Sequence, residues 1–195
     1  MSGIIGSYHN IRGSGVVNKL GTDGQVFTST GVGGAAGFED AAGGGGKVGQ
    51  VVSTAKTDTT STTSTTYADV SGMSVANTCA ATSSKVLVLV MAQGSLNDGG
   101  LSFKVIRDST DILIGDADGD RARGVFGGTS YLQSHMQGFN YSFLDSPSST
   151  SEVTYKLQWL TQSAKTNYMN RASYDSDLVY YTRGASTITA MEILA

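Results

Sequence analysis

The chain has 195 residues, of which 39% are hydrophobic and 15% are charged, and its formal net charge is −3. This weak negative charge argues against nucleic acid as a partner, because nucleic-acid-binding proteins need a basic surface. The single cysteine excludes an intrachain disulfide, and no apolar run approaches the roughly 18 to 20 residues of a membrane span.

The first 46 residues form a glycine-rich segment that ends in the run GGGG at 43–46. Glycine has the most conformational freedom to lose on folding, and the apolar pieces of this segment are too short to build a core. We therefore predict an extended N-terminal arm, residues 1–46, that is anchored by contact with another protein chain. The N-terminus lacks a signal-peptide pattern, which predicts a protein made in a cytoplasm and used there or released by lysis.

Within the arm, residues 31–36 (GVGGAA) match the dinucleotide-binding fingerprint with alanine in its last place. That fingerprint binds pyrophosphate only between a strand and the N-terminus of a helix. More glycine and no helical pattern follow here, so we predict no nucleotide cofactor.

From residue 47 onward the sequence is patterned for β-strands, and no window has helical periodicity. Glycine, Asn and Asp separate the runs, and Pro147 is the only proline. The predicted strands are 61–67 at an edge, 85–91, 101–105, 131–144 with Gly138 as a bend or bulge, 152–159, and 186–194. This spacing predicts an all-β domain over residues 47–195, a jelly-roll-like antiparallel β-sandwich of roughly eight strands.

Residues 85–91 (KVLVLVM) are apolar on both faces of their predicted strand, and the 186–194 strand is apolar or small on both. A strand in an ordinary antiparallel sandwich has one wet face. A parallel α/β core would also explain such a run, but the pattern lacks the helices that this fold requires. A homotrimer would cover the second face. Its predicted interface residues are Val86, Val88, Val90, Met191 and Ile193.

Asp116, Asp118 and Asp120 alternate within residues 115–124, a spacing that could offer oxygen ligands to calcium. The EF-hand register fails, because a glycine comes one place early and another glycine occupies the position of the terminal Glu. Neighbouring arginines can neutralise the carboxylates, so we predict a solvated loop without metal.

His9 and His135 are the only histidines, and Cys79 is far from both in sequence. A zinc site needs three or four clustered ligands, and a serine hydrolase needs a nucleophile turn such as G-x-S-x-G, which is absent. We therefore expect no metal, no cofactor and no catalytic activity. We place His135 on a packed or interface face of a strand, Cys79 among small buried groups and Trp159 in the core.

Residues 167–184 (NYMNRASYDSDLVYYTRG) place four tyrosines among Asn, Asp and Arg: Tyr168, Tyr174, Tyr180 and Tyr181. Aromatic side chains most often pack in cores and turns. Exposed tyrosines in a polar setting are also typical of surfaces that recognise sugars or proteins. These four residues are therefore the candidate recognition site.

Two sets of segments resemble proteins of bacteriophages. Residues 21–31, GTDGQVFTSTG, resemble the GTDGQVLTSTG segment that recurs in tail-fibre and other appendage proteins. Residues 83–90, 141–147 and 187–193 (SSKVLVLV, YSFLDSP and TITAMEI) resemble the β-rich C-terminal domain of structural proteins of marine phages, including cyanophages. The resemblance extends over most of the chain, from residue 21 to residue 193.

The resemblance implies a trimeric virion component without catalytic residues. We expect it to be assembled in the host cytoplasm, to meet capsid or tail proteins through its arm, and to contact a host glycan. Tail fibres are usually longer, with shaft repeats that are absent here, which favours a head fibre, a capsid decoration protein or a short tail fibre. Two alternatives stay open: a carbohydrate-binding module of an enzyme complex, and a glycan hydrolase with Asp175 and Asp177 as candidate carboxylates.

Overall fold

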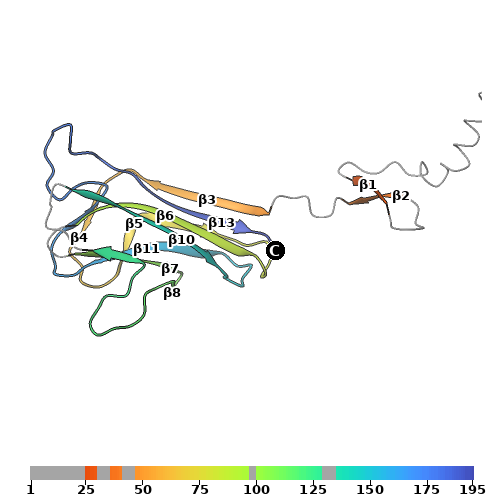
Figure 1. Cartoon of the computed structure of the whole chain (residues 1–195), viewed down its shortest axis with the longest axis horizontal. Helices are drawn as coiled ribbons and strands as arrows, with labels where there is room; N and C mark the ends of the chain where they lie inside the picture. The colour runs from red at the N-terminus through yellow and green to blue at the C-terminus, as the bar shows by residue number, and fades with distance from the viewer. Residues whose placement is uncertain (1–24, 30–35, 41–46, 97–99, 129–134) are drawn as a thin grey trace, which may run out of the picture. The chain divides into compact units, whose positions relative to one another are not determined.

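The computed structural model describes residues 25–29, 36–40, 47–96, 100–128 and 135–195 (Figure 1). The chain divides into two compact units, residues 1–46 and residues 47–195. In the first unit, β1 (Gln25–Ser29) and β2 (Ala36–Asp40) pair as an antiparallel hairpin. This local pairing differs from the fully extended arm that the composition predicts, because two short β-patterned runs lie close together in the sequence. His9 lies outside the described residues.

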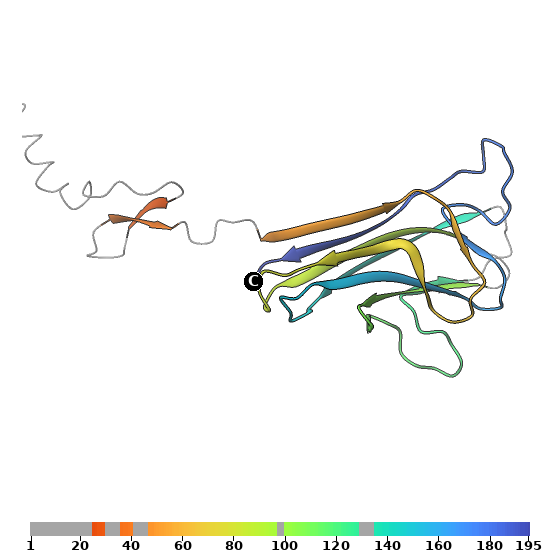
Figure 2. The same ribbon diagram turned by 180° about the vertical axis from the view of Figure 1, so that it is seen from behind.

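The second unit is built from two antiparallel sheets. Sheet 1 contains β3 (Val48–Lys56), β13 (Ser186–Ile193), β6 (Lys85–Ser95), β10 (Met136–Asp145), β12 (Asn167–Met169) and β4 (Thr60–Thr62). Sheet 2 contains β5 (Ala68–Asn77), β11 (Val153–Thr161), β7 (Leu101–Arg107), β8 (Thr110–Ile112) and β9 (Phe126–Gly128). The two sheets pack face to face as a sandwich, and the described residues contain no helix (Figures 1 and 2).

The strand order is that of a jelly roll. Across sheet 1 the long strands run β3-β13-β6-β10, and across sheet 2 the order is β5-β11-β7-β8. Counted in chain order, these eight strands give 1-8-3-6 facing 2-7-4-5, so the chain passes from one sheet to the other between successive strands, except between the fourth and fifth, β7 and β8. The predicted jelly-roll-like sandwich is confirmed. The short strands β4, β9 and β12 extend the two sheets.

In β6, the run with two apolar faces has one face in the core and the other on the outside of the sandwich. One parity faces the core and is at most 3% exposed: Val86, Val88 and Val90. The other parity faces outward: Leu87, Leu89 and Met91. The prediction that Val86, Val88 and Val90 form a subunit interface needs correction, because these side chains already pack against sheet 2. Met191 and Ile193 on β13 do have the outward parity.

The centre of the sandwich is aromatic. The ring of Phe103 lies 6.2 Å from that of Trp159 and 5.1 Å from that of Phe139, and Trp159 is 3% exposed. Trp159 is therefore a core residue, as the alternation along residues 152–159 predicts. The neighbouring Tyr155 is also fully buried, and its hydroxyl donates to Asp145 at 2.8 Å.

Two predicted strands differ in detail. The predicted edge strand 61–67 forms only as β4. After it, the Ser64 hydroxyl donates to the Thr66 carbonyl and accepts from the Thr66 amide, which closes a turn instead. Gly138 neither bends nor bulges β10, which pairs with β6 in unbroken register over ten residues. Register shifts lie instead between Lys156 and Gln158 in sheet 2 and between Met191 and Ile193 in sheet 1. The described residues contain no helix that could cross a membrane.

Candidate functional site

The candidate recognition tyrosines lie on one excursion of the chain between β12 and β13, residues 170–185, which we call the tyrosine loop. The loop is closed at its base, where the Gly184 amide donates to the Asn170 carbonyl at 2.9 Å. Closure of its ends by a main-chain hydrogen bond makes this segment a compact Ω-type loop.

Asn170 fixes the base of the loop. It is fully buried and has a φ of 62°, a left-handed conformation that Asn tolerates better than most residues. Its side-chain amide donates to the carbonyls of Lys56 and Asp58 at 2.8 and 2.9 Å, and it accepts from the Ser186 hydroxyl at 2.6 Å. These bonds tie the start of the loop to β3 and to the first residue of β13.

A carboxylate holds the two sides of the loop together. Asp175 accepts from Arg171 at 2.5 Å and from Arg183 at 2.7 Å. Partial burial alone would raise the pKa of Asp175, but the hydrogen bonds from Arg171 and then Arg183 outweigh that effect and lower it below the usual aspartate value. Asp175 therefore stays ionised. It is a poor proton donor, and its ion pairs link the two sides of the loop.

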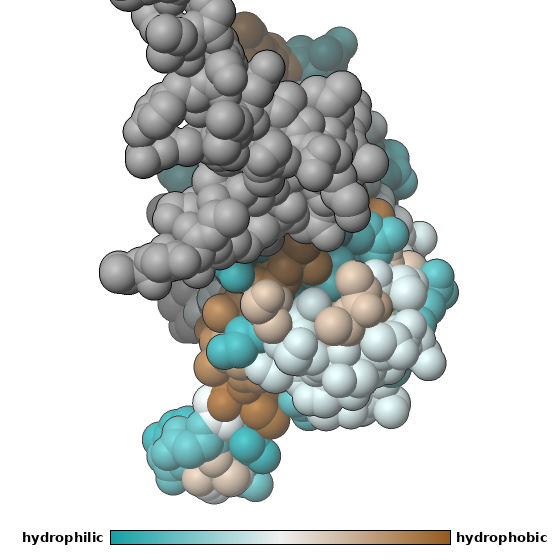
Figure 3. All heavy atoms as spheres, turned by 90° about the vertical axis from the view of Figure 1, so that its right-hand side faces the viewer, coloured by the Kyte–Doolittle hydropathy of each residue, from teal (hydrophilic) through white to brown (hydrophobic). Residues whose placement is uncertain are grey.

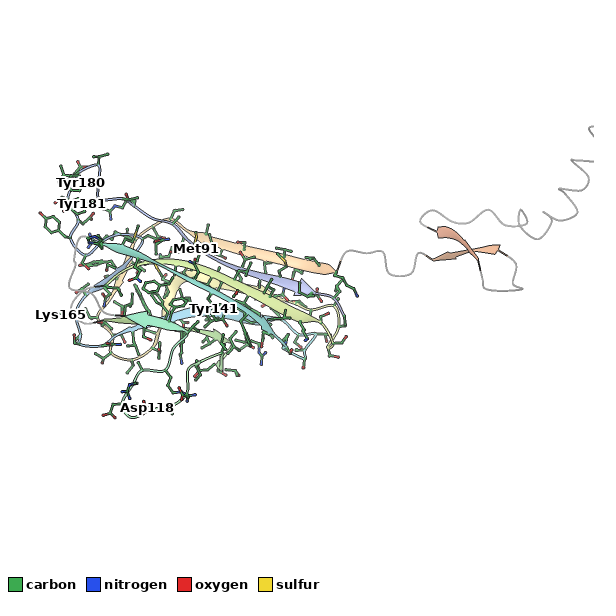
Figure 4. The ribbon with its side chains drawn as sticks, viewed as in Figure 1. Met91, Asp118, Tyr141, Lys165, Tyr180 and Tyr181 are labelled. Carbon is green, nitrogen blue, oxygen red and sulfur yellow. The ribbon has the colours of Figure 1, made fainter. Side chains whose placement is uncertain are left out.

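Three of the four predicted tyrosines come together on this braced loop. The ring of Tyr181 lies 4.9 Å from that of Tyr180 and 5.4 Å from that of Tyr174. At the tip, Tyr180 is 68% exposed and Val179 is 98% exposed. The loop therefore displays an aromatic and apolar tip, and Figure 4 shows Tyr180 and Tyr181 at one end of the sandwich.

Tyr168 does not lie on the loop itself. It lies on β12, one strand before the loop, and the guanidinium of Arg171 sits 3.7 Å from the centre of its ring. This cation–π contact holds Arg171 in position while the same side chain donates to Asp175. Tyr168 thus supports the loop through Arg171, whereas Tyr174, Tyr180 and Tyr181 form its surface.

The loop lies at the end of the sandwich opposite to the point where residues 47–195 begin and end. The Leu194 amide donates to the Lys47 carbonyl at 2.8 Å, and Glu192 pairs opposite Val86. At the other end of β6, Gly94 pairs with Met169, just before the loop. Eight residues of strand, about 26 Å, separate the two ends, and Figure 2 shows the same separation from behind.

The aspartate segment forms an exposed loop between β8 and β9. Asp118 pairs with Arg121 at 2.6 Å, and Arg123 donates to the Gly115 carbonyl at 2.7 Å. The loop projects as a hydrophilic protrusion, with Asp118 near its end (Figures 3 and 4). Within the described residues, no group of three or more His, Cys, Asp or Glu could hold a metal ion.

The remaining candidates lie apart from one another. His135 is exposed and immediately precedes β10, so it is outside the strand in which it was predicted. Cys79 is 3% exposed, and burial raises the pKa of its thiol, as expected for a small buried group. Asp177 is exposed in the tyrosine loop, whereas its predicted partner Asp175 is engaged by two arginines.

A depression of about 780 Å³ opens between β7, β9 and the aspartate loop. Among the described residues that line it are Ser102, Asp120 and Arg121. The Ser102 hydroxyl is hydrogen-bonded to that of Tyr67 at 2.8 Å.

Sequence reasoning named Asp175 only as a candidate hydrolase carboxylate and missed the bracing of the tyrosine loop. Arg171, Asp175 and Arg183 are separated by four and eight positions, a spacing typical of any polar loop. Asn170 carries a weak signal, since Asn directly after a β-patterned run often takes the left-handed conformation at a turn.

Comparison with known proteins gives one structural likeness to report. The sequence matches no protein-family model and no curated protein. A chain in a solved structure of infectious bursal disease virus, Gx strain, is similar at a TM-score of 0.33 and 11% sequence identity. The likeness covers 88% of this chain and 42% of the viral one, so the chain spans less than half of that protein. A TM-score this low transfers no role.

Proposed function

We propose that this chain is a non-enzymatic structural protein of a bacteriophage virion, of the head-fibre, decoration or short tail-fibre type. It docks on the particle through residues 1–46 and presents the sandwich of residues 47–195 as a homotrimer. The resemblance of residues 21–31 to phage appendage proteins, and of three sandwich segments to phage structural proteins, supports this proposal. The jelly-roll order of the strands is compatible with it.

The observation that carries the proposal is that the two ends of the sandwich differ. Residues 47 and 194 are hydrogen-bonded at one end, and the braced tyrosine loop lies at the other. A sandwich attached at one end and carrying an ordered, exposed tip at the other has the arrangement that an adhesive appendage needs. Its tip would be the part that meets a second surface.

The chemistry of the tip favours a glycan as the contacted group. Tyrosine rings offer flat apolar faces to the C–H groups of a sugar, and their hydroxyls can hydrogen-bond to its polar edge. Arg171 and Asp175 brace the loop that carries these rings, so less conformational entropy is lost on binding. Attachment to a host-surface glycan is therefore the adhesive role that we propose.

Two measurements test the proposal. A cryo-EM density map of the virion encoded by the same genome should contain the sandwich on the head or tail; absence of the protein from purified particles would contradict the assignment. A glycan array probed with the full chain should show binding that Tyr180→Ala abolishes. Leu113→Ala, an exposed position after β8, is the control and should leave binding unchanged.

The second candidate function, a carbohydrate-binding module of an enzyme complex, is favoured by the same cluster of three tyrosine rings. The virion map separates the two, because a module of an enzyme complex would bind glycan and yet be absent from the particle. Hydrolysis of the bound glycan would point to the less favoured hydrolase. In that case Asp175→Asn should abolish turnover, whereas a purely bracing role predicts only weaker binding.

A further inference from the structure

The two outer faces of the sandwich differ in chemistry. The outer face of sheet 2 carries ion pairs between Lys104 and Asp111 at 2.7 Å and between Lys156 and Asp69 at 3.1 Å. Such a ladder of opposite charges is suited to water. The outer face of sheet 1 has a single charged residue among the outward-facing positions of its four long strands, Lys85, which lies at the start of β6.

A continuous apolar row crosses sheet 1 instead. Strand register places Met191 opposite both Val51 and Leu87, and Leu87 opposite Leu144, so these four side chains are direct neighbours across four strands. Val51 is 50% exposed and Leu144 is 44% exposed. Leu89 and Met91 continue the patch along β6. Contiguous apolar surface of this kind on a soluble chain marks an interaction site.

The next row of the same face consists of hydroxyls around Leu89. Thr189 pairs opposite Ser53 and Leu89, and Ser142 lies on the other side of Leu89. The hydroxyls of Ser53 and Thr189 are hydrogen-bonded to each other at 2.8 Å. A hydroxyl both donates and accepts, so this row can hydrogen-bond with a copy of itself.

We infer that the outer face of sheet 1 binds a second copy of this chain, with the row Val51, Met191, Leu87 and Leu144 at the centre of the contact. A face that meets a copy of itself must avoid like charges, and the middle of this face has none. Four strands of about ten residues span roughly 19 by 33 Å, or about 600 Å². A stable interface buries about 800 Å² per partner, so this face supplies most of the area needed.

This inference rests on the self-association in the proposed function and names the surface that joins two subunits. A face that pairs with its own copy makes a two-fold contact, so a trimer would need three such faces packed around one axis. Such a contact also accounts for the second apolar face of β6, whose first face is already covered by sheet 2. A partner that differed from this chain would be expected to show charges to match, and sheet 1 offers none at its centre.

Light scattering of the full chain tests the inference. The wild-type chain should form an oligomer at tens of micromolar, and Leu89→Glu and Met91→Glu should shift it to the 20.2 kDa monomer, because symmetry brings the new charges together. Leu113→Glu is the matched control, since Leu113 is 51% exposed and lies after β8 in sheet 2. Far-UV circular dichroism of each variant verifies that the sandwich is folded.

A cross-linking experiment keeps the test decisive if a charged variant fails to fold. Cys79 is buried, so Ser142→Cys introduces a single accessible thiol on the outer face of sheet 1. A short bis-maleimide should link subunits through this thiol, and Ser74→Cys on β5 should remain unlinked. A monomeric wild-type chain, or equal linking of both variants, would overturn the inference. A dimer would support the interface and contradict only the trimer, leaving the virion role to its own test.

Discussion

At the scale of single residues, Glu192 organises the end of the sandwich where the unit begins and ends. It is 2% exposed and accepts from the amides of Ala80 at 2.7 Å and Gln50 at 3.3 Å. Gly49 leaves room for it, because a Cβ at that position would overlap the carboxylate. Burial raises the pKa of Glu192, but hydrogen bonds from Ala80, Ser84 and Gln50 outweigh burial and lower it below the usual glutamate value.

We predict that Glu192→Gln destabilises the sandwich in a pH-dependent way. A carboxylate whose folded-state pKa is lowered contributes stability that is present above the unfolded pKa of about 4.3 and is lost as the pH falls through the folded value. The variant should lose about 1 to 3 kcal/mol at pH 7, because an amide group then faces main-chain donors.

Urea unfolding at pH 7 and at pH 3 checks this prediction, with the exposed Glu152→Gln as the control. The difference between wild type and Glu192→Gln should shrink at the lower pH. An equal difference at both values would show that the negative charge of Glu192 contributes nothing to stability.

Trp159 provides a second residue-scale prediction. Its ring packs beside Phe103 at the centre of the core, so Trp159→Ala should lower the free energy of unfolding by about 3 to 5 kcal/mol. Leu178→Ala removes a side chain that is 49% exposed in the tyrosine loop and should change stability by less than about 0.5 kcal/mol. Chemical denaturation of both variants gives the comparison, and an unshifted Trp159→Ala midpoint would contradict its core position.

At the scale of elements, the tyrosine loop is ordered by a few contacts at its base and across its middle. Asn170 ties it to β3 and β13, and Asp175 joins its two sides. The loop makes little contribution to the core, since its exposed residues include Leu178, Val179 and Tyr180. Its order and the stability of the sandwich should therefore respond to different substitutions.

We predict that Asp175→Asn loosens the tyrosine loop without melting the sandwich. The neutral amide keeps the size of the side chain but removes the charge that holds both arginines. Chymotrypsin, which cleaves after tyrosine, should cut this variant several-fold faster within residues 174–181, while its melting temperature stays within about 2 °C of wild type. Asp177→Asn serves as the control, and equal cleavage of all three proteins would show that the brace is unimportant.

The loop between β8 and β9 should need no metal. Its carboxylates are exposed, and Asp118 is already paired with Arg121. We predict that neither EDTA nor a triple Asp→Asn substitution at 116, 118 and 120 shifts the melting temperature by more than about 2 °C. Calorimetry with and without EDTA measures this, and a drop of more than about 5 °C in both experiments would identify a calcium site instead.

At the scale of the whole molecule, the chain consists of two compact units with a boundary after residue 46. We predict that residues 47–195 alone fold with a melting temperature close to that of the full chain, because the core cluster of the described residues lies within this unit. The shortened chain should fail to join the virion, which co-purification with particles would reveal. Unfolding of residues 47–195 on their own would show that the first 46 residues complete the core.

The sequence by itself determined the class of fold and several single positions. Alternating polarity over residues 152–159 is a local property, so it predicted both a strand and the burial of Trp159. The absence of helical periodicity and the spacing of the turns predicted an all-β sandwich, and the mismatch with the EF-hand register predicted a solvated aspartate loop. The clustered tyrosines predicted an exposed aromatic segment, and three of them do lie together on one loop, but the pattern did not show how that loop is held.

Only the tertiary structure decided which face of β6 is covered, because both parities of residues 85–91 are apolar and the pattern is the same for either choice. Pairing with β13 and β10 turns Val88 toward sheet 2 and leaves Leu89 outside. The brace at Asp175 and the anchor at Asn170 likewise depend on contacts between residues distant in sequence, such as Asn170 and Lys56. Such contacts are set by strand register, which no single segment of the sequence contains.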